Sequence, residues 1–186
     1  MHLLASTSGI ISDQNDAIDL CQTPGEIVIL SAADSDLACL SAAYRRLTVG
    51  SYSLRLVNLL QLNHNLSVDL YIEKTLCHAR LIIIRLIGGL NYWPYGLSEI
   101  KAVAEKFDIR LVVIPGDDKP DVELTSYSTV SPEILERCWM YFTHGGIDNA
   151  LNLLIYANSI LGDKQPWKEP APLLKAGFYW PSIDLP

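Results

Sequence analysis

Positive charge is scarce in this chain. Its 186 residues include 14 lysines and arginines against 21 aspartates and glutamates, which gives a formal net charge of -7. The basic residues form no cluster, whereas binding to a phosphate backbone needs grouped Lys and Arg. We therefore expect no nucleic-acid partner.

Long apolar runs are also missing. No run reaches the roughly 18 residues that would span a bilayer. The N-terminus, MHLLASTSG, has no basic segment ahead of an apolar one. We predict no membrane segment and a cytoplasmic location.

Motifs for metals and nucleotides are equally sparse. The cysteines form no C-x-x-C pair, and the four histidines are dispersed. We predict free thiols, with no disulfide framework and no metal site. No G-x-x-x-x-G-K-[ST] sequence occurs, so ATP binding has no support from the residues. The cysteines are Cys21, Cys39, Cys77 and Cys138.

The chain does contain a regular alternation of apolar segments. Hydrophobic residues make up 49% of it and charged residues 19%, which is typical of a folded globular protein. Apolar runs predict strands at 2–5, 26–30, 54–60, 81–84 and 109–114, and the continuous runs at 26–30 and 81–84 are typical of buried strands. Helical patterns with end signals fall at 36–46, 67–79, 98–107, 131–143 and 147–161.

This order predicts an α/β fold. We expect a doubly wound, mostly parallel five-stranded sheet of the flavodoxin-like or Rossmann-like class, with flavodoxin-like strand order preferred. Two additional C-terminal helices complete an N-terminal domain at 1–162. The tail at 163–186 holds five of the ten prolines and two of the four tryptophans. We predict that it is an irregular linker to a next domain that this chain lacks.

The stretch RLIIIRLIGGLNYWPYG at 80–96 is the strongest candidate for a site. Gly88 and Gly89 follow the buried strand, and Tyr92 and Trp93 come directly after them. Ligands of parallel sheets bind outside the carboxyl ends of the strands. The same residues also suit a turn with an aromatic cap on the sheet, and the local pattern favours this structural interpretation.

Two other loops invite a functional reading. Asp117 and Asp118 follow the last predicted strand, where a carboxylate pair can bind a hard cation, although an Asx-type turn is the favoured interpretation. The hydroxyl-rich loop at 6–9 is a weak phosphate-binding candidate. The HGG sequence at 144–146 is expected to end a helix.

Several stretches together resemble the N-terminal region of the cobaltochelatase large subunit, the CobN family, which is related to the magnesium chelatase large subunit. The resemblance covers essentially the whole chain, including HGG at 144–146 and GFYWP at 177–181. The other matching stretches are LLAST at 3–7, QTPGEIVILSAADSDLACLSAA at 22–43, SLRLVNLLQLNHNLSVDLYIEKT at 53–75, RLIIIRLIGGLNYWPYG at 80–96 and PGDDKPD at 115–121.

The resemblance implies a part in aerobic cobalamin biosynthesis. In this family the large subunit binds hydrogenobyrinic acid a,c-diamide and inserts Co(II), while smaller AAA+ ATPase and integrin-type partner subunits supply ATP hydrolysis. Members are far longer than this chain, and the residues thought to handle the metal lie in later regions. We therefore expect a fragment that is inactive alone, with no catalytic residue and no cofactor of its own.

A flat macrocycle with carboxylates and amides needs aromatic faces, close backbone approach and a cation. The candidate tetrapyrrole-binding residues are Arg85, Gly88, Gly89, Tyr92 and Trp93, with Asn63 and His64 on the adjacent loop. Two alternatives remain open: a non-catalytic flavodoxin-like domain that binds a nucleotide or flavin, and a pure protein-interaction domain.

Overall fold

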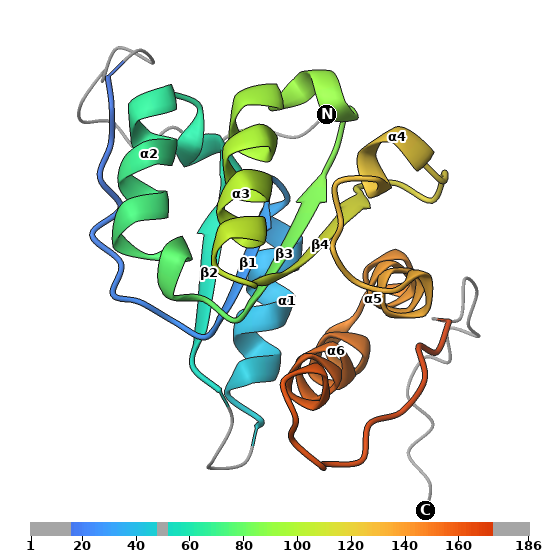
Figure 1. Cartoon of the computed structure of the whole chain (residues 1–186). Helices are drawn as coiled ribbons and strands as arrows, with labels where there is room; N and C mark the ends of the chain where they lie inside the picture. The colour runs from blue at the N-terminus through green and yellow to red at the C-terminus, as the bar shows by residue number, and fades with distance from the viewer. Residues whose placement is uncertain (1–15, 48–51, 173–186) are drawn as a thin grey trace, which may run out of the picture.

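The computed structural model describes residues 16–47 and 52–172. These residues form a four-stranded sheet covered by helices on both faces (Figure 1). All three neighbouring strand pairs are parallel, in the order β2-β1-β3-β4. The strands are β1 (Ile27–Ser31), β2 (Leu54–Asn58), β3 (Leu81–Leu86) and β4 (Arg110–Pro115).

The predicted parallel α/β class is confirmed, but the predicted five strands are confirmed only in part. Four of them are present, and the one expected at 2–5 lies outside the described residues. The order 2-1-3-4 agrees with a flavodoxin-like sheet as far as its fourth strand. The chain moves to one side of β1 to form β2 and to the other side to form β3. The carboxyl ends of β1 and β3 therefore flank the point where the strand order reverses.

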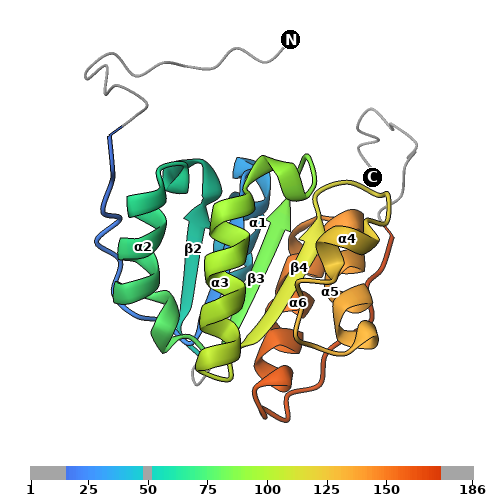
Figure 2. The same ribbon diagram turned by 45° about the horizontal axis from the view of Figure 1, so that its top comes forward.

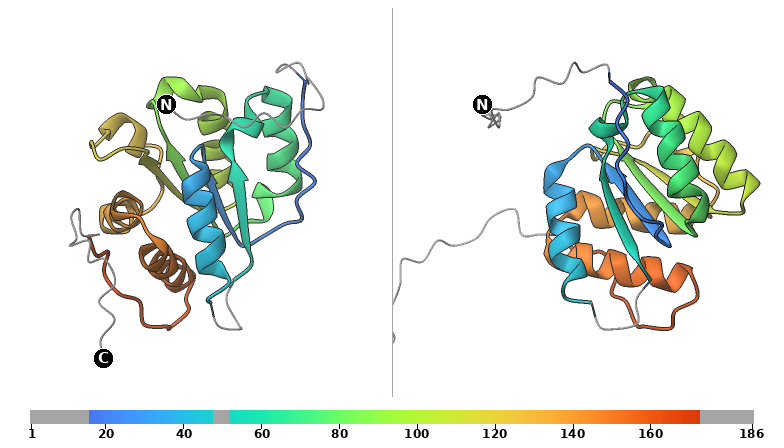
Figure 3. Two further views of the ribbon diagram at one scale, coloured as in Figure 1. Left: turned by 180° about the vertical axis from the view of Figure 1, so that it is seen from behind. Right: turned by 90° about the vertical axis from the view of Figure 1, so that its left-hand side faces the viewer.

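Helices cover the two faces of the sheet unequally (Figures 2 and 3). Alternate residues along each strand face opposite clusters, so Val28 and Ile82 face one and Ile29 and Ile83 face the other. This burial on both faces explains why β1, β3 and β4 are largely continuous apolar runs, while β2, at the edge of the sheet, is only partly buried. One face holds α2 (Asn65–Lys74) and α3 (Pro94–Lys106); the other holds α1 (Asp34–Tyr44), α5 (Pro132–His144) and α6 (Ile147–Ile160).

Three helix predictions need correction. The helix predicted at 67–79 is α2, which ends at Lys74 and is followed by a separate 3-10 helix at Leu76–His78. α3 begins at Pro94, four residues before the expected start at 98, because proline is tolerated in the first turn, where no backbone donor is needed. Residues 119–130, where the sequence predicts no helix, contain a short helix, α4 (Val122–Thr125), whose first turn is capped by Asp121. The ends of α5 and α6 agree with prediction, and Gly145 and Gly146 separate them with positive φ angles.

Part of the predicted linker packs on the domain. The Trp167 ring meets Tyr156 edge-on, with 4.8 Å between the ring centroids. The Asn149 side chain donates to the Ala171 carbonyl at 2.7 Å and accepts from its backbone N–H at 3.0 Å. Residues 163–172 thus form a strap along α5 and α6. The domain boundary at 162 and a following domain stay predictions.

The structure also shows the state of the cysteines and the character of the helices. All four cysteines are free. Cys138 is buried in α5, and this burial raises the pKa of its thiol to about 12. No helix within 16–47 and 52–172 is long and apolar enough to cross a membrane.

A glycine of α3 gives a test of the packing. A Cβ at Gly96 would lie 2.1 Å from the Trp93 ring. We expect Gly96→Ala to lower the free energy of unfolding by about 1–3 kcal/mol through overpacking, although alanine is by itself the better helix former. Urea unfolding followed by tryptophan fluorescence measures the effect. Ser98→Ala, at an exposed position of the same helix, is the control. A gain in stability for Gly96→Ala would contradict this packing.

Candidate functional site

A buried ion pair lies at the carboxyl edge of the sheet. Nη1 of Arg85, near the end of β3, lies 2.6 and 2.7 Å from the two carboxylate oxygens of Asp36 in the first turn of α1. The two side chains are only 13% and 12% exposed. Ser31, at the end of β1, donates its hydroxyl to Asp36 at 2.7 Å. Nη2 of Arg85 donates to the Gly116 carbonyl at 2.6 Å.

This network changes the interpretation of Arg85. Nη1 and Nη2 each donate to groups of the chain itself, and the remaining nitrogen, Nε, is buried without a partner. The side chain also lies over the Phe142 ring, 5.3 Å from the centroid. In this structure Arg85 therefore presents no exposed cation to a ligand, and it joins β3, α1 and the loop after β4.

Trp93 is likewise part of the interior. Its ring is 5% exposed, and its indole N–H donates to the Leu62 carbonyl at 2.9 Å. Tyr92, in contrast, is 48% exposed. Its ring lies beside Gly88, where an added Cβ would come within 3.3 Å of it. Of the two predicted aromatic contacts, only Tyr92 offers a face to solvent.

Gly88 and Gly89 line a cleft of about 420 Å³ between the turn after β3 and the loop after β4. Both have positive φ angles, +96° and +73°, which favour glycine. A Cβ at Gly89 would lie 3.4 Å from a carboxylate oxygen of Asp121. Glycine therefore lets the two loops approach closely. The other lining residues are Leu86, Pro115, Asp117, Lys119, Pro120, Asp121 and Val122.

The loop after β4 contributes both charge signs to this cleft. Asp117 accepts a hydrogen bond from the backbone N–H of Lys119 at 3.3 Å, which is the Asx-type turn favoured by the sequence. Lys119 is exposed and places a positive charge in the lining of the cleft, where Arg85 does not reach. Sequence reasoning missed Lys119, although it lies in the PGDDKPD stretch that carried the family resemblance.

Asn63 and His64 lie apart from the cleft, beyond the carboxyl end of β2. Asn63 is exposed. His64 is the N-cap of α2, and its ring nitrogen accepts from the backbone N–H of Leu66 at 3.1 Å. Ser67, where the predicted helix at 67–79 would begin, lies inside α2, and its hydroxyl accepts from the backbone N–H of Ile18 at 2.7 Å. The structure thus brings together Gly88, Gly89 and Tyr92, but not Asn63 and His64 with them.

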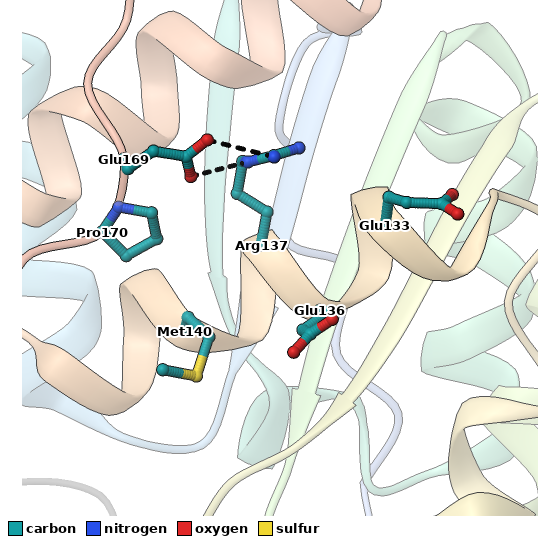
Figure 4. A pocket seen from close by; sticks show the side chains of 6 residues that line it. All are labelled: Glu133, Glu136, Arg137, Met140, Glu169 and Pro170. Carbon is teal, nitrogen blue, oxygen red and sulfur yellow. Dashed lines mark hydrogen bonds and ion pairs between the residues drawn. The ribbon is translucent and has the colours of Figure 1, made fainter.

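A second hollow, of about 300 Å³, lies between α5 and the strap (Figure 4). Arg137 binds Glu169 there through two hydrogen bonds of 2.9 and 3.1 Å. This bond to Glu169 raises the pKa of Arg137 further above its ordinary value. On the same helix, a hydrogen bond from Ser131 lowers the pKa of Glu133. The described residues contain no group of three or more His, Cys, Asp or Glu arranged to hold a metal ion.

The sheet and the helices on its two faces define a domain of the doubly wound α/β class. No family model matches the sequence. Curated relatives do: the aerobic cobaltochelatase subunit CobN of a Sinorhizobium species is 46% identical over 185 residues, which cover 100% of this chain and 14% of the relative. The CobN of Pseudomonas aeruginosa is 41% identical over 182 residues, covering 97% of this chain and 14% of the relative.

A solved structure agrees with these relatives. The catalytic subunit of cobaltochelatase from Mycobacterium tuberculosis matches with a TM-score of 0.63 and 25% identity, covering 83% of this chain and 12% of that one. The chain therefore belongs to the CobN cobaltochelatase subunit family. It spans 14% of the length of the curated relatives that it matches.

The buried ion pair gives a stability test. Asp36→Ala would leave the Arg85 guanidinium buried and unpaired, so we expect a loss of about 3–5 kcal/mol in the free energy of unfolding. The double variant Asp36→Leu/Arg85→Met, which removes both charges, is expected to lie closer to the unaltered protein. Urea denaturation measures both.

Asp148→Ala is the matched control, because it removes the exposed partner of Arg46 and should change stability little. Equal losses in the free energy of unfolding for Asp36→Ala and Asp148→Ala would show that the buried pair stabilises the fold no more than an exposed pair does.

Proposed function

We propose that this chain is the N-terminal segment of the large, tetrapyrrole-binding subunit of an ATP-dependent cobaltochelatase. The complete enzyme would insert Co(II) into hydrogenobyrinic acid a,c-diamide during aerobic cobalamin biosynthesis in the cytoplasm. The observation that carries this proposal is the 46% identity to a CobN subunit along the entire chain. Co(II) and the corrin are substrates here, and the segment has no resident cofactor in this proposal.

The segment would contribute binding surface to the enzyme. The sequence has no P-loop, so AAA+ ATPase and integrin-type partner subunits would supply and transmit the energy of ATP hydrolysis. The relatives are about seven times as long as the match, so ample chain remains to carry the catalytic residues. Alone, the segment is expected to be inactive.

Contact with the tetrapyrrole is proposed at the carboxyl edge, beside the cleft between the β3 and β4 loops. Tyr92 offers an aromatic face, and Gly88 and Gly89 allow close backbone approach. Lys119 can pair with a substrate carboxylate, while the Asp117 carboxylate suits amide donors. The cleft is smaller than a macrocycle, so this edge would form one wall of a larger site.

The remaining candidates take different parts in this proposal. Arg85 and Trp93 support the two loops from the interior, since both are buried and hydrogen-bonded. Asn63 and His64 flank the edge at the end of β2, where a ligand that extends beyond the cleft would reach them.

A chimaeric subunit tests the function. We expect a Sinorhizobium CobN whose matching segment is replaced by this chain to insert cobalt with its partner subunits. The same subunit with the segment deleted should be inactive, because one wall of the site is missing. The measurement is the change in corrin absorbance on cobalt insertion. An inactive but folded chimaera, or an active deletion, would refute the proposal.

The tetrapyrrole contact has its own test in the chimaera. Tyr92→Ala should weaken binding of hydrogenobyrinic acid a,c-diamide about tenfold, since one stacking face is lost. Quenching of tryptophan fluorescence during titration gives the affinity. Tyr44→Ala is the control, because Tyr44 is also exposed but lies at the far end of α1. Equal affinities for the two variants would remove Tyr92 from the site.

A further inference from the structure

An apolar groove of about 260 Å³ runs between α4 and α5. Leu135 and Trp139 of α5 form one wall, and Ile114 at the end of β4 lies at its base. Val122, the first residue of α4, is 82% exposed. A side chain of this kind is stabilised when a partner covers it, at about 25 cal/mol per Å² of apolar surface removed from water.

The rim of this groove is acidic. Residues 117–136 contain six carboxylates and one cation, Lys119, so most of the chain's net charge of -7 is gathered here. Asp121 and Glu136 line the groove directly. The ion pairs of the described residues involve neither Glu133 nor Glu136.

Figure 4 shows Glu133 and Glu136 on α5 without an ionic partner among the side chains drawn. The nearest cation on the helix, Arg137, is held by Glu169 of the strap. The carboxylates of α5 therefore have no ion-pair partner among the described residues and can attract positive charge from another polypeptide. A groove with an apolar floor and an acidic rim fits an apolar anchor flanked by Lys or Arg.

The groove adjoins the cleft. Pro115, Pro120, Asp121 and Val122 line both hollows. Glu136 in turn lines both the groove and the hollow beside the strap. A polypeptide seated in the groove would therefore wall one side of the cleft and run towards the strap, where residues 163–172 leave α6.

We propose that the α4–α5 groove is the surface on which this segment docks onto the rest of the cobaltochelatase subunit. The occupant is a segment of that subunit with an apolar side chain against Val122 and Trp139 and with Lys or Arg facing Asp121, Glu133 and Glu136. The relatives supply the candidate polypeptide, because this chain spans only 14% of their length. The inference rests on the proposed function and adds where the segment attaches.

The test is assembly in trans. The full 186-residue chain is titrated calorimetrically with the Sinorhizobium CobN subunit that lacks the matching segment. We expect saturable binding that weakens with added salt. Val122→Glu should weaken it about tenfold or more, because a charge would enter the apolar contact. The charge reversal Glu133→Lys/Glu136→Lys should weaken it about tenfold and reduce its dependence on salt.

Matched controls lie on α3 and just beyond its end. Phe107→Glu alters another exposed apolar side chain, and Glu105→Lys reverses another exposed carboxylate. Both should bind as the unaltered chain does, and circular dichroism melts confirm that every variant is folded. Absence of binding by the folded chain, or equal affinities for Val122→Glu and Phe107→Glu, would overturn the docking surface. Cobalt insertion by the covalent chimaera is a separate readout. If the chimaera is active but the chain does not bind in trans, or the two variants bind equally, the docking proposal fails while the proposed function stands.

Discussion

Arg85 brings a positive charge into the interior, and the carboxyl edge of the sheet is arranged to neutralise it. Asp36 binds the guanidinium from α1, Gly116 binds it through the carbonyl after β4, and Ser31 orients Asp36 from the end of β1. An uncompensated buried charge costs several kcal/mol, so these elements are held in register with one another. The loops that follow β3 and β4 start from this fixed point, and it is these loops that form the cleft.

The close approach of the β3 and β4 loops has a second cause. Gly116 faces Ile87 so closely that a Cβ there would lie 2.1 Å from Cγ1 of Ile87. The ion pair and this contact together set the width of the cleft. Beyond it, α4 and α5 present an apolar groove with an acidic rim, and the cleft and the groove adjoin at residues 120–122.

The sequence predicted β1, β3 and β4 well because each is a largely continuous apolar run with both faces buried, whereas the edge strand β2 is only partly buried. The runs at 26–30, 81–84 and 109–114 fall within two residues of β1, β3 and β4. Helix starts were less predictable: α3 begins at Pro94 and not near 98, because proline suits a first turn as well as a loop. Gly88 and Gly89 were correctly placed just after β3, since two adjacent glycines after an apolar run favour a turn.

The sequence by itself determined the parallel α/β class, the strand positions and the family, because these depend on local patterns and on residue identities along the whole chain. Only the tertiary structure decided what each candidate side chain does. Arg85 pairs with Asp36, 49 residues away, and the indole of Trp93 reaches the Leu62 carbonyl, 31 residues away. Such partners meet only when the helices have packed on the sheet. The same packing brings α4 against α5, and no local pattern in the sequence encodes the groove between them.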